Sequence, residues 1–382
     1  MKITGIICEY NPLHLGHRKQ MDLIRRTCGD DEGIVCLMSG NFVQRGMPAI
    51  IDKMRRAEAA LLCGADLVLE LPVTYALSSA EGFAAGGVEI LSGFCDRLCF
   101  GAETADPDLL KRTAQALLGK DFSAALKAEL AKGVSFPAAR QVALEATGLD
   151  STLLQTPNNI LAVEYCKAIQ AQGSAMQPFV IPRNGNYHDS APDADNPSAT
   201  ALRQLMLSGG NWRSYVPAEA ASCFTNAPLH TMAAGERAVL AKLRCMTDSE
   251  FEALPYGSEG LWRKFMHAAR KEPTLEAILS AVKSKRYTRT RLERMMLCAF
   301  LGITQADIAS TAPYVRVLAL NDRGREILKL ARASGDFPNI GEHIEHPYQL
   351  LESRCGAMYG LFSHNTPDAP DTESQNRIVY RP

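Results

Sequence analysis

The residues that most constrain the fold lie at the start of the chain, where a short apolar run is followed by a turn and a helical pattern. The run Ile3–Cys8 is too short for a buried helix and is rich in β-branched residues, so it predicts a buried strand. Residues 9–12, Glu-Tyr-Asn-Pro, end that strand. A strand that turns directly into a helix presents free backbone N–H groups and the positive end of the helix dipole at the edge of a sheet. This junction therefore predicts an anion site, with phosphate as the expected occupant.

The same junction carries two histidines, in the order His14-Leu15-Gly16-His17. Imidazole groups can donate hydrogen bonds to phosphoryl oxygens as negative charge builds up on them. Gly16 has no Cβ, so we expect a nucleotide to approach the backbone closely there. The alternative is a purely structural role for both histidines, which their position between a strand and a helix disfavours.

Length and composition predict a two-domain globular protein of ordinary type. The chain has 382 residues, of which 46% are hydrophobic and 22% are charged. Because the net charge is −1, binding of nucleic acid would require a local basic patch. The eleven cysteines contain no C-x-x-C pair, which favours reduced thiols over disulfides or a zinc site. No apolar run has the length of a membrane span and no signal core is visible, so we expect a cytoplasmic protein without a membrane partner.

Strands and helices alternate over the first hundred residues. Further strands are predicted at 33–38, 66–71 and 96–100, and helices at 53–63 and 79–94. This alternation predicts an α/β fold with a doubly wound parallel sheet. In such sheets ligands bind at the carboxyl ends of the strands. We therefore expect four residues to converge there, namely His14, His17, Arg45 and Gly101.

Three later segments are candidates for contacts to phosphate. Residues 39–46, Ser-Gly-Asn-Phe-Val-Gln-Arg-Gly, follow the second strand and are interpreted as a phosphate or substrate loop with Arg45 as its cation, or as a surface turn. After a predicted strand at 176–181, the loop 182–189 either closes over a nucleotide or is a linker. The helix start at 198–203 is rich in hydroxyl groups and suits phosphate as well, with Ser198, Thr200 and Arg203 as candidate ligands.

Beyond residue 212 the strand signals fade. We predict domains at 1–210 and 211–382, the second one mainly α-helical, with at most one short strand at 315–320.

Residues 283–294 contain six basic residues and one acidic residue, together with hydroxyl groups and a tyrosine. Such a segment suits a nucleic-acid backbone, although a solvated helix face has the same composition.

Taken together, these segments resemble one enzyme family. The sequence EYNPxHxGH at residues 9–17, SGNFVQRG at 39–46, ELP at 70–72, PNNIL at 157–161 and KRYTR at 285–289 look like the bacterial tRNA(Met) cytidine acetate ligases, which are HIGH-type nucleotidyltransferases. The resemblance runs nearly end to end, apart from the segment after His364. It implies that ATP and acetate form acetyl-adenylate, and that the acetyl group then passes to the wobble cytidine of elongator tRNA(Met). It also implies a nucleotidyltransferase fold for the first domain.

The resemblance also implies site residues. His14, His17 and Arg45 would be catalytic, and Lys53 would be a further candidate for phosphate binding. Mg²⁺ is expected to arrive with ATP, because no Asp/Glu cluster suggests a protein metal site, and no obligate protein partner is evident. The tRNA would be held by Lys283, Lys285, Arg286, Arg289 and Arg291. ATP would be bound by Ile7, Cys8, Asn11, Pro12, His14, Gly16, His17, Gln20, Gly101, Arg183 and either Asn158 or Asn159; a helix cap is the alternative role for both asparagines.

Two other classes of protein remain open at this point. Another HIGH-type ligase or adenylyltransferase, acting on a small metabolite, would explain the first domain but not the basic segment. A non-catalytic RNA-binding protein would explain the basic segment but not the paired histidines.

Overall fold

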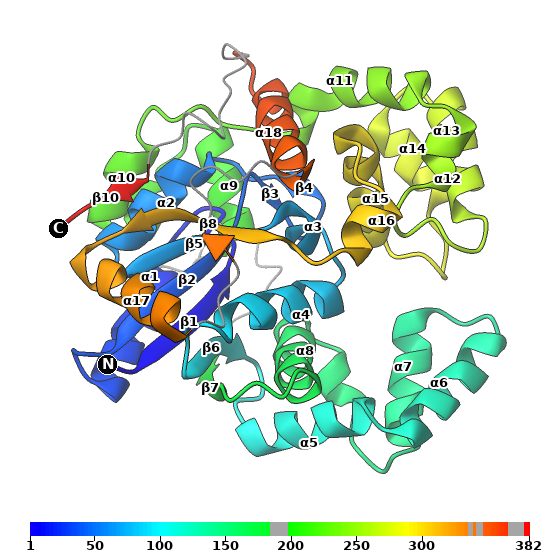
Figure 1. Cartoon of the computed structure of the whole chain (residues 1–382). Helices are drawn as coiled ribbons and strands as arrows, with labels where there is room; N and C mark the ends of the chain where they lie inside the picture. Colours follow the sequence, from blue (N-terminus) through cyan, green and yellow to red (C-terminus); the bar gives the residue numbers. More distant parts are fainter. Residues whose placement is uncertain (184–197, 335–338, 341–346, 366–377) are drawn as a thin grey trace.

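The computed structural model describes residues 1–183, 198–334, 339–340, 347–365 and 378–382. Most of the loop expected to close over a nucleotide, residues 184–189, lies outside these ranges. One large sheet, in the order β10-β8-β5-β2-β1-β6-β7 with β9 paired to β8, forms the centre of the molecule (Figure 1). Its strands are β1 (Ile3–Cys8), β2 (Gly33–Ser39), β5 (Leu67–Leu71), β6 (Arg97–Ala102), β7 (Gln177–Pro182), β8 (Tyr314–Leu320), β9 (Asn339–Ile340) and β10 (Val379–Tyr380).

Helices cover both faces of this sheet, as the alternation of strands and helices predicts. The strand β2 shows why, because successive side chains point to opposite faces: Ile34 and Cys36 pack on one face, and Val35 and Leu37 on the other. The first face is covered by α1 (Leu15–Cys28), α2 (Lys53–Leu62), α9 (Ala199–Leu207) and α10 (Ala218–Phe224). Residues of α4 (Ala80–Leu91), α5 (Pro107–Leu117), α8 (Pro157–Ala171) and α17 (Asp322–Ser334) belong to the core on the other.

The pairing of the strands confirms the predicted parallel sheet. Strands β5, β2, β1, β6 and β7 are mutually parallel. Strands β2 and β5 lie on one side of β1, and the later strands β6 and β7 lie on its other side, so the order of the strands reverses at β1. Their carboxyl ends therefore meet where the turn after β1 leads into α1, which is the place predicted for the ligand.

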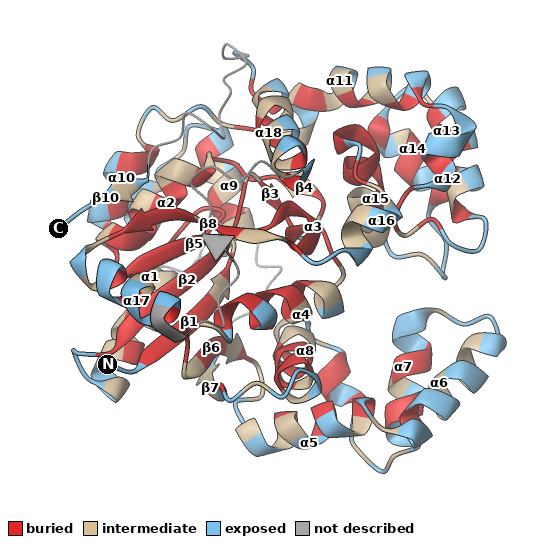
Figure 2. Cartoon of the chain, in the orientation of Figure 1, coloured by how far each residue is buried: buried red, intermediate tan, exposed pale blue. Residues whose placement is uncertain are grey.

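The helical part of the chain lies to one side of the sheet, at the upper right of Figure 1. Buried residues line the sheet and the inner faces of the helices, as Figure 2 shows. The helical part consists of α11 (Met232–Cys245), α12 (Asp248–Glu252), α13 (Leu261–Lys271), α14 (Leu275–Val282), α15 (Arg289–Leu301) and α16 (Gln305–Ala309). The other α-helices are α3 (Val73–Ala76), α6 (Lys120–Ala131), α7 (Phe136–Glu145) and α18 (Pro347–Tyr359), and β3 (Phe42–Val43) and β4 (Met47–Pro48) form a small hairpin.

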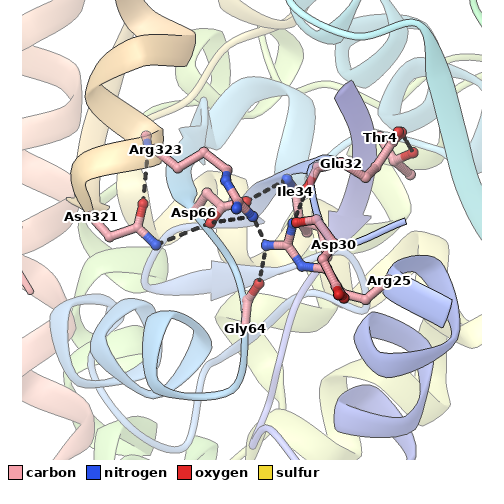
Figure 3. Close-up of polar contacts among 10 residues, drawn as sticks. Thr4, Arg25, Asp30, Glu32, Ile34, Gly64, Asp66, Asn321 and Arg323 are labelled. Atoms are coloured by element: carbon pink, nitrogen blue, oxygen red, sulfur yellow. Dashed lines mark hydrogen bonds and ion pairs between the residues drawn. The ribbon is translucent and has the colours of Figure 1, made fainter. Parts of the chain in front are cut away.

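The chain returns to the sheet after this helical part, so a division at residue 210 does not follow the sheet. Strand β8 is seven residues long and pairs antiparallel with β5. Figure 3 shows Asp66, the residue directly before β5, whose carboxylate joins the returning segment to α1. Its carboxylate accepts hydrogen bonds from Arg25 (2.7 Å) and from the side-chain amide of Asn321 (3.0 Å). The helical part α11–α16 thus spans residues 232–309 of the region 211–382 that was expected to be mainly helical, and the later strands β8, β9 and β10 extend the large sheet.

All eleven cysteines are unpaired, and nine of them are buried. Among the residues described, no helix combines the length and the apolar character that crossing a membrane requires.

Candidate active site

Two histidines lie at the start of α1, and the ring of each accepts a hydrogen bond from a backbone N–H group there. His14 is the N-cap residue, with extended backbone angles, and its Nδ1 accepts a hydrogen bond from the backbone N–H of Gly16 at 3.1 Å. In return, Nδ1 of His17 accepts from the backbone N–H of His14 at 3.2 Å. This is a reciprocal capping box built from imidazoles, where Ser or Thr and Glu or Gln are usual. The positions of both rings are thus fixed by the start of the helix.

This capping arrangement determines the protonation of both rings. A neutral imidazole that accepts at Nδ1 carries its proton on Nε2. Burial, and then the positive charge of Arg183, lower the pKa of His14 to about 3. Burial also lowers the pKa of His17, followed by the effects of His14 and Arg183. At neutral pH both rings are therefore uncharged, and each can offer one Nε2–H donor to a ligand.

A cavity of about 240 Å³ opens beside these rings at the carboxyl ends of β1 and β6. Most of the residues predicted to bind ATP or phosphate line it, so elements far apart in the sequence are brought together there as expected. Glu9 is the only carboxylate among the lining residues that the structure describes. The predicted residues in the lining are Ile7, Cys8, Asn11, His14, His17, Gln20, Arg45, Gly101, Asn158, Arg183, Ser198, Thr200 and Arg203.

Four of the residues predicted to bind ATP or phosphate lie outside this lining, namely Pro12, Gly16, Lys53 and Asn159. Gly16 serves the helix cap through its N–H. Lys53 is buried, and its ammonium group donates to both carboxylate oxygens of Glu70 at 2.8 Å. The assignment of Lys53 to phosphate is therefore wrong for this geometry, because its charge is committed to an internal ion pair.

The two asparagines at the start of α8 have different roles, and neither is the cap residue, which is Thr156. Asn159 is buried, and its side-chain oxygen accepts from the backbone N–H of Thr104 at 2.9 Å. Asn158 lines the cavity, and its side-chain oxygen accepts from Arg183 at 3.2 Å. Of the two, Asn158 is thus the one positioned to meet a ligand.

Glu103 occupies the start of α8 in a way that the sequence did not reveal. Its carboxylate accepts from the N–H of Asn159 (2.7 Å) and from the side chains of Asn158 (2.7 Å) and Thr156 (3.0 Å). The carboxylate satisfies the free donors of this helix start and orients Asn158 toward Arg183. The only signal in the sequence is its position two residues after Gly101, at the end of a predicted strand.

A second residue missed in the sequence, Arg56, joins the two loops that follow β1 and β2. Its guanidinium group is fully buried and donates to the backbone oxygens of Glu9 (2.6 Å) and Ser39 (3.1 Å), and also to that of Gly40. Buried carbonyl groups need donors, and one planar guanidinium serves several at once. Arg56 therefore fixes the turn before His14 relative to the loop that carries Arg45.

The loop at residues 39–46 contains β3 and leads into β4, and it is also in contact with the helical part of the chain. Gly46 has a positive φ of 79°, and a Cβ there would lie 2.5 Å from the backbone nitrogen of Arg294 in α15. The N–H of Gln44 donates to the Glu9 carboxylate at 2.9 Å. The surface-turn interpretation of this loop is therefore wrong, since the loop is packed between the sheet and α15 and Arg45 faces the cavity.

The start of α9 borders the cavity and is already hydrogen-bonded within the chain. Ser198 is its N-cap residue and accepts from the N–H of Ala201 at 3.1 Å. Arg203 donates to the backbone oxygen of Asn11 at 2.8 Å and to the Thr200 hydroxyl at 3.0 Å. These contacts fasten α9 to the turn after β1.

Fewer of the basic side chains at residues 283–294 are available to bind RNA than the sequence suggests. Arg289 forms an ion pair with Glu276 at 2.5 Å, and Arg286 forms one with Glu259 at 2.6 Å. Arg291 is partly buried and donates to the backbone oxygen of Tyr256. Lys283 and Lys285 are exposed. These three arginines thus have partners within the chain, which a count of charges cannot show.

The described residues include no group of three or more His, Cys, Asp or Glu side chains that would hold a metal ion. The cavity instead collects neutral and cationic donors, which suits a triphosphate.

The fold and this cavity define a nucleotidyltransferase, and the family model described as HIGH Nucleotidyl Transferase matches residues 1–371. A protein of Alkaliphilus metalliredigens named tRNA(Met) cytidine acetate ligase is 38% identical over 372 residues, covering 89% of this chain and 87% of that protein. A protein of the same name from Clostridium novyi is 38% identical over 399 residues and covers both chains fully. The chain belongs to this tRNA(Met) cytidine acetate ligase family.

Solved structures agree with this assignment. The crystal structure of apo Thermotoga maritima TmcAL matches with a TM-score of 0.91 at 29% identity, covering 100% of this chain and 99% of that one. The same protein bound with alpha-thio ATP matches with a TM-score of 0.89 at 30% identity and the same coverage.

Proposed function

We propose that this protein is an ATP-dependent ligase that acetylates the wobble cytidine of elongator tRNA(Met). In the first step an oxygen of acetate attacks the α-phosphorus of ATP, the bond to the bridging β-phosphate oxygen breaks, and acetyl-adenylate and pyrophosphate form. In the second step the exocyclic amine of cytidine attacks the acetyl carbon, the amine loses a proton, and AMP leaves.

The observation that carries this proposal is the pair of neutral imidazoles at the start of α1. Acetate is already a nucleophile, so the first step requires no base; it requires placement and stabilisation of charge on the phosphoryl oxygens. The Nε2–H donors of His14 and His17 supply that stabilisation from fixed positions, with Arg45 and Arg183 as cations on the same cavity. Mg²⁺ would be carried by the triphosphate, since Glu9 is the only carboxylate among the described residues of the lining.

Support for the substrates comes from the names of the relatives and from the ATP analogue bound by the Thermotoga maritima protein. A cytidine in an anticodon loop can be splayed out and reached by an enzyme, in contrast to one in a duplex. Within the basic segment we propose Lys283 and Lys285 as tRNA contacts, because they are exposed while the neighbouring arginines have partners within the chain.

Exchange of labelled pyrophosphate into ATP tests the first step. We expect exchange that requires both acetate and the protein. Exchange that requires a different small acid would favour a metabolite-specific ligase, and absence of exchange with every acid would favour a non-catalytic RNA-binding protein.

A further inference from the structure

Helix α13 presents a basic face to solvent. It contains no acidic residue, and its apolar side chains, among them Phe265 and Ala269, are buried. Figure 2 shows exposed residues along this helix. Every exposed residue of this helix is basic or histidine: Arg263, Lys264, His267, Arg270 and Lys271.

Three of these residues form one line along the helix. Arg263, His267 and Lys271 are separated by four residues each, which places neighbours on the same side of a helix. At 1.5 Å per residue the line is about 12 Å long, and Lys264 lies beside its first member. The guanidinium of Arg263 also lies over the Trp262 ring, 5.0 Å from its centroid. We call Arg263, Lys264, His267 and Lys271 the α13 stripe.

The α13 stripe and the basic segment at 283–294 differ in how many of their charged side chains form ion pairs within the chain. In the segment, Arg286 and Arg289 are paired with glutamates. In α13, only Arg270 forms an ion pair among the described residues, with Asp248 at 2.6 Å, and it is therefore left out of the stripe. Lys264 donates to the backbone oxygen of Val282 at 3.1 Å, which places the stripe next to the exposed Lys283.

We propose that the α13 stripe binds the phosphate backbone of the RNA substrate. This inference rests on the proposed function, because it concerns where the tRNA of that reaction is held. Lysine and arginine contacts to phosphate position a nucleic acid without reading its bases. The stripe therefore supplies affinity and orientation, and the base to be modified is selected elsewhere.

The position of α13 favours an extended polyanion over a small substrate. Helix α13 packs against α14, and α14 against α15. The backbone of α15 at Arg294 touches Gly46 in the loop that borders the cavity. Two helix-to-helix contacts, each with axes about 8–10 Å apart, separate the stripe from that loop. A folded RNA can contact both places, whereas a small substrate bound in the cavity does not reach the stripe.

The test compares three triple variants for binding to an elongator tRNA(Met) transcript over a series of salt concentrations. The stripe variant is Arg263→Ala, Lys264→Ala, Lys271→Ala. Alanine has the highest helix propensity, so α13 should be retained. The segment variant is Lys285→Ala, Arg286→Ala, Arg289→Ala. The matched control, Arg112→Ala, Lys120→Ala, Lys127→Ala, removes the same charge from α5 and α6.

We expect the stripe variant to lose about ten-fold or more in tRNA affinity at ~0.1 M salt. Its plot of log affinity against log salt should become shallower by about 0.7 to 0.9 for each phosphate that is no longer neutralised, or roughly 2 to 3 in total. The control should bind as the wild type does, and the segment variant should lose less than the stripe variant. Thermal unfolding of each variant establishes that it is folded.

Unchanged affinity and slope in a folded stripe variant, with tight binding by the wild type, would overturn the stripe as the RNA site. An equal loss in the control variant would overturn it too, since the effect would then follow net charge alone. If the wild type itself neither binds nor acetylates the transcript, the proposed function fails instead. Binding of an acidic protein in place of RNA would likewise contradict the inference.

Discussion

The imidazole rings of His14 and His17 stack with their centroids 3.7 Å apart and their planes inclined by 25°. Two charged rings at this separation would repel each other, so the stack is compatible with neutral rings and agrees with the lowered pKa of both. The hydrogen bonds that cap the helix at Nδ1 thus fix the tautomer of both rings, and each ring keeps an Nε2–H group as a donor. The proposed catalytic role and the capping role can be separated by substitution, because the cap uses Nδ1 and the proposed donor is Nε2–H.

The substitution His14→Asn should preserve the cap and remove the catalytic donor. Asparagine is a favourable N-cap residue whose side-chain oxygen can accept from the N–H of Gly16. We expect acetate-dependent pyrophosphate exchange to fall by about two orders of magnitude or more, as for loss of one transition-state donor. His14→Ala should lose activity similarly and about 1 kcal/mol of stability in addition. Near-normal exchange in the Asn variant would show that His14 acts only as a cap.

His17→Gln makes the corresponding separation at the other ring. Glutamine is a usual third residue of a capping box, and its oxygen can accept from the N–H of His14. The variant should unfold at nearly the same temperature as the wild type but lose exchange activity by about two orders of magnitude or more. If His17→Gln lowers the melting temperature together with the exchange activity, His17 has a structural role alone.

The buried His14 should make stability depend on pH in a defined direction. Its pKa is about 3 in the folded protein and about 6.5 when unfolded. Below pH 6.5 the unfolded chain binds a proton that the folded chain does not, so stability is complete above pH 6.5 and falls as the pH falls. The loss approaches about 2 kcal/mol at pH 5. Denaturant unfolding of His14→Asn should show a flatter decline between pH 7 and pH 5, whereas the exposed His267→Asn should decline as the wild type does.

Arg183 should contribute to ATP binding through its fork of donors. Arg183→Ala should weaken ATP binding measured by calorimetry by about ten-fold or more, as for loss of a charge-assisted hydrogen bond. Arg183→Lys should restore it only in part, because an ammonium group cannot make the bidentate contact. Equal affinity in the wild type and the Ala variant would remove Arg183 from the nucleotide site.

Lys53 should matter for stability and not for nucleotide binding. Lys53→Met leaves Glu70 buried without its cation, which typically costs about 3 to 5 kcal/mol. The pKa of Glu352, raised by burial and then by Glu70 to about 7, shows that uncompensated charge is already costly there. The double variant Lys53→Met, Glu70→Gln should recover part of this loss. ATP affinity of the folded Lys53→Met protein should match the wild type, and a large loss of affinity would return Lys53 to the phosphate site.

Local patterns predicted the part of the fold that surrounds the site. The strand Ile3–Cys8, the parallel strands after it and the start of α1 all depend on periodicity and turn residues within short windows. The return of β8 to pair with β5 could not be predicted in this way, because its partner lies about 250 residues earlier in the chain. The strand was visible as a short apolar run, but its place in the sheet was not.

The site residues likewise divide into those that local patterns predict and those whose role depends on contacts between distant parts of the chain. Residues at the carboxyl ends of strands, such as His14 and Gly101, were predicted because topology alone brings such ends together. Lys53 was misassigned because its partner Glu70 depends on how α2 packs over β5. The ion pairs of Arg286 and Arg289 likewise involve glutamates at least thirteen positions distant, except for the pair of Arg289 with Glu293. Arg56 looks in the sequence like any basic residue of an exposed helix.

The most direct test of the proposed ligase is mass spectrometry of nucleosides from elongator tRNA(Met) after incubation with the protein, ATP and isotopically labelled acetate. We predict that labelled acetylcytidine forms at the wobble position with the wild type, is absent when ATP is omitted, and forms about two orders of magnitude or more slowly with His14→Asn. Acetate-dependent pyrophosphate exchange without any labelled nucleoside would contradict the account, and so would acetylcytidine formed at full rate by the His14→Asn variant.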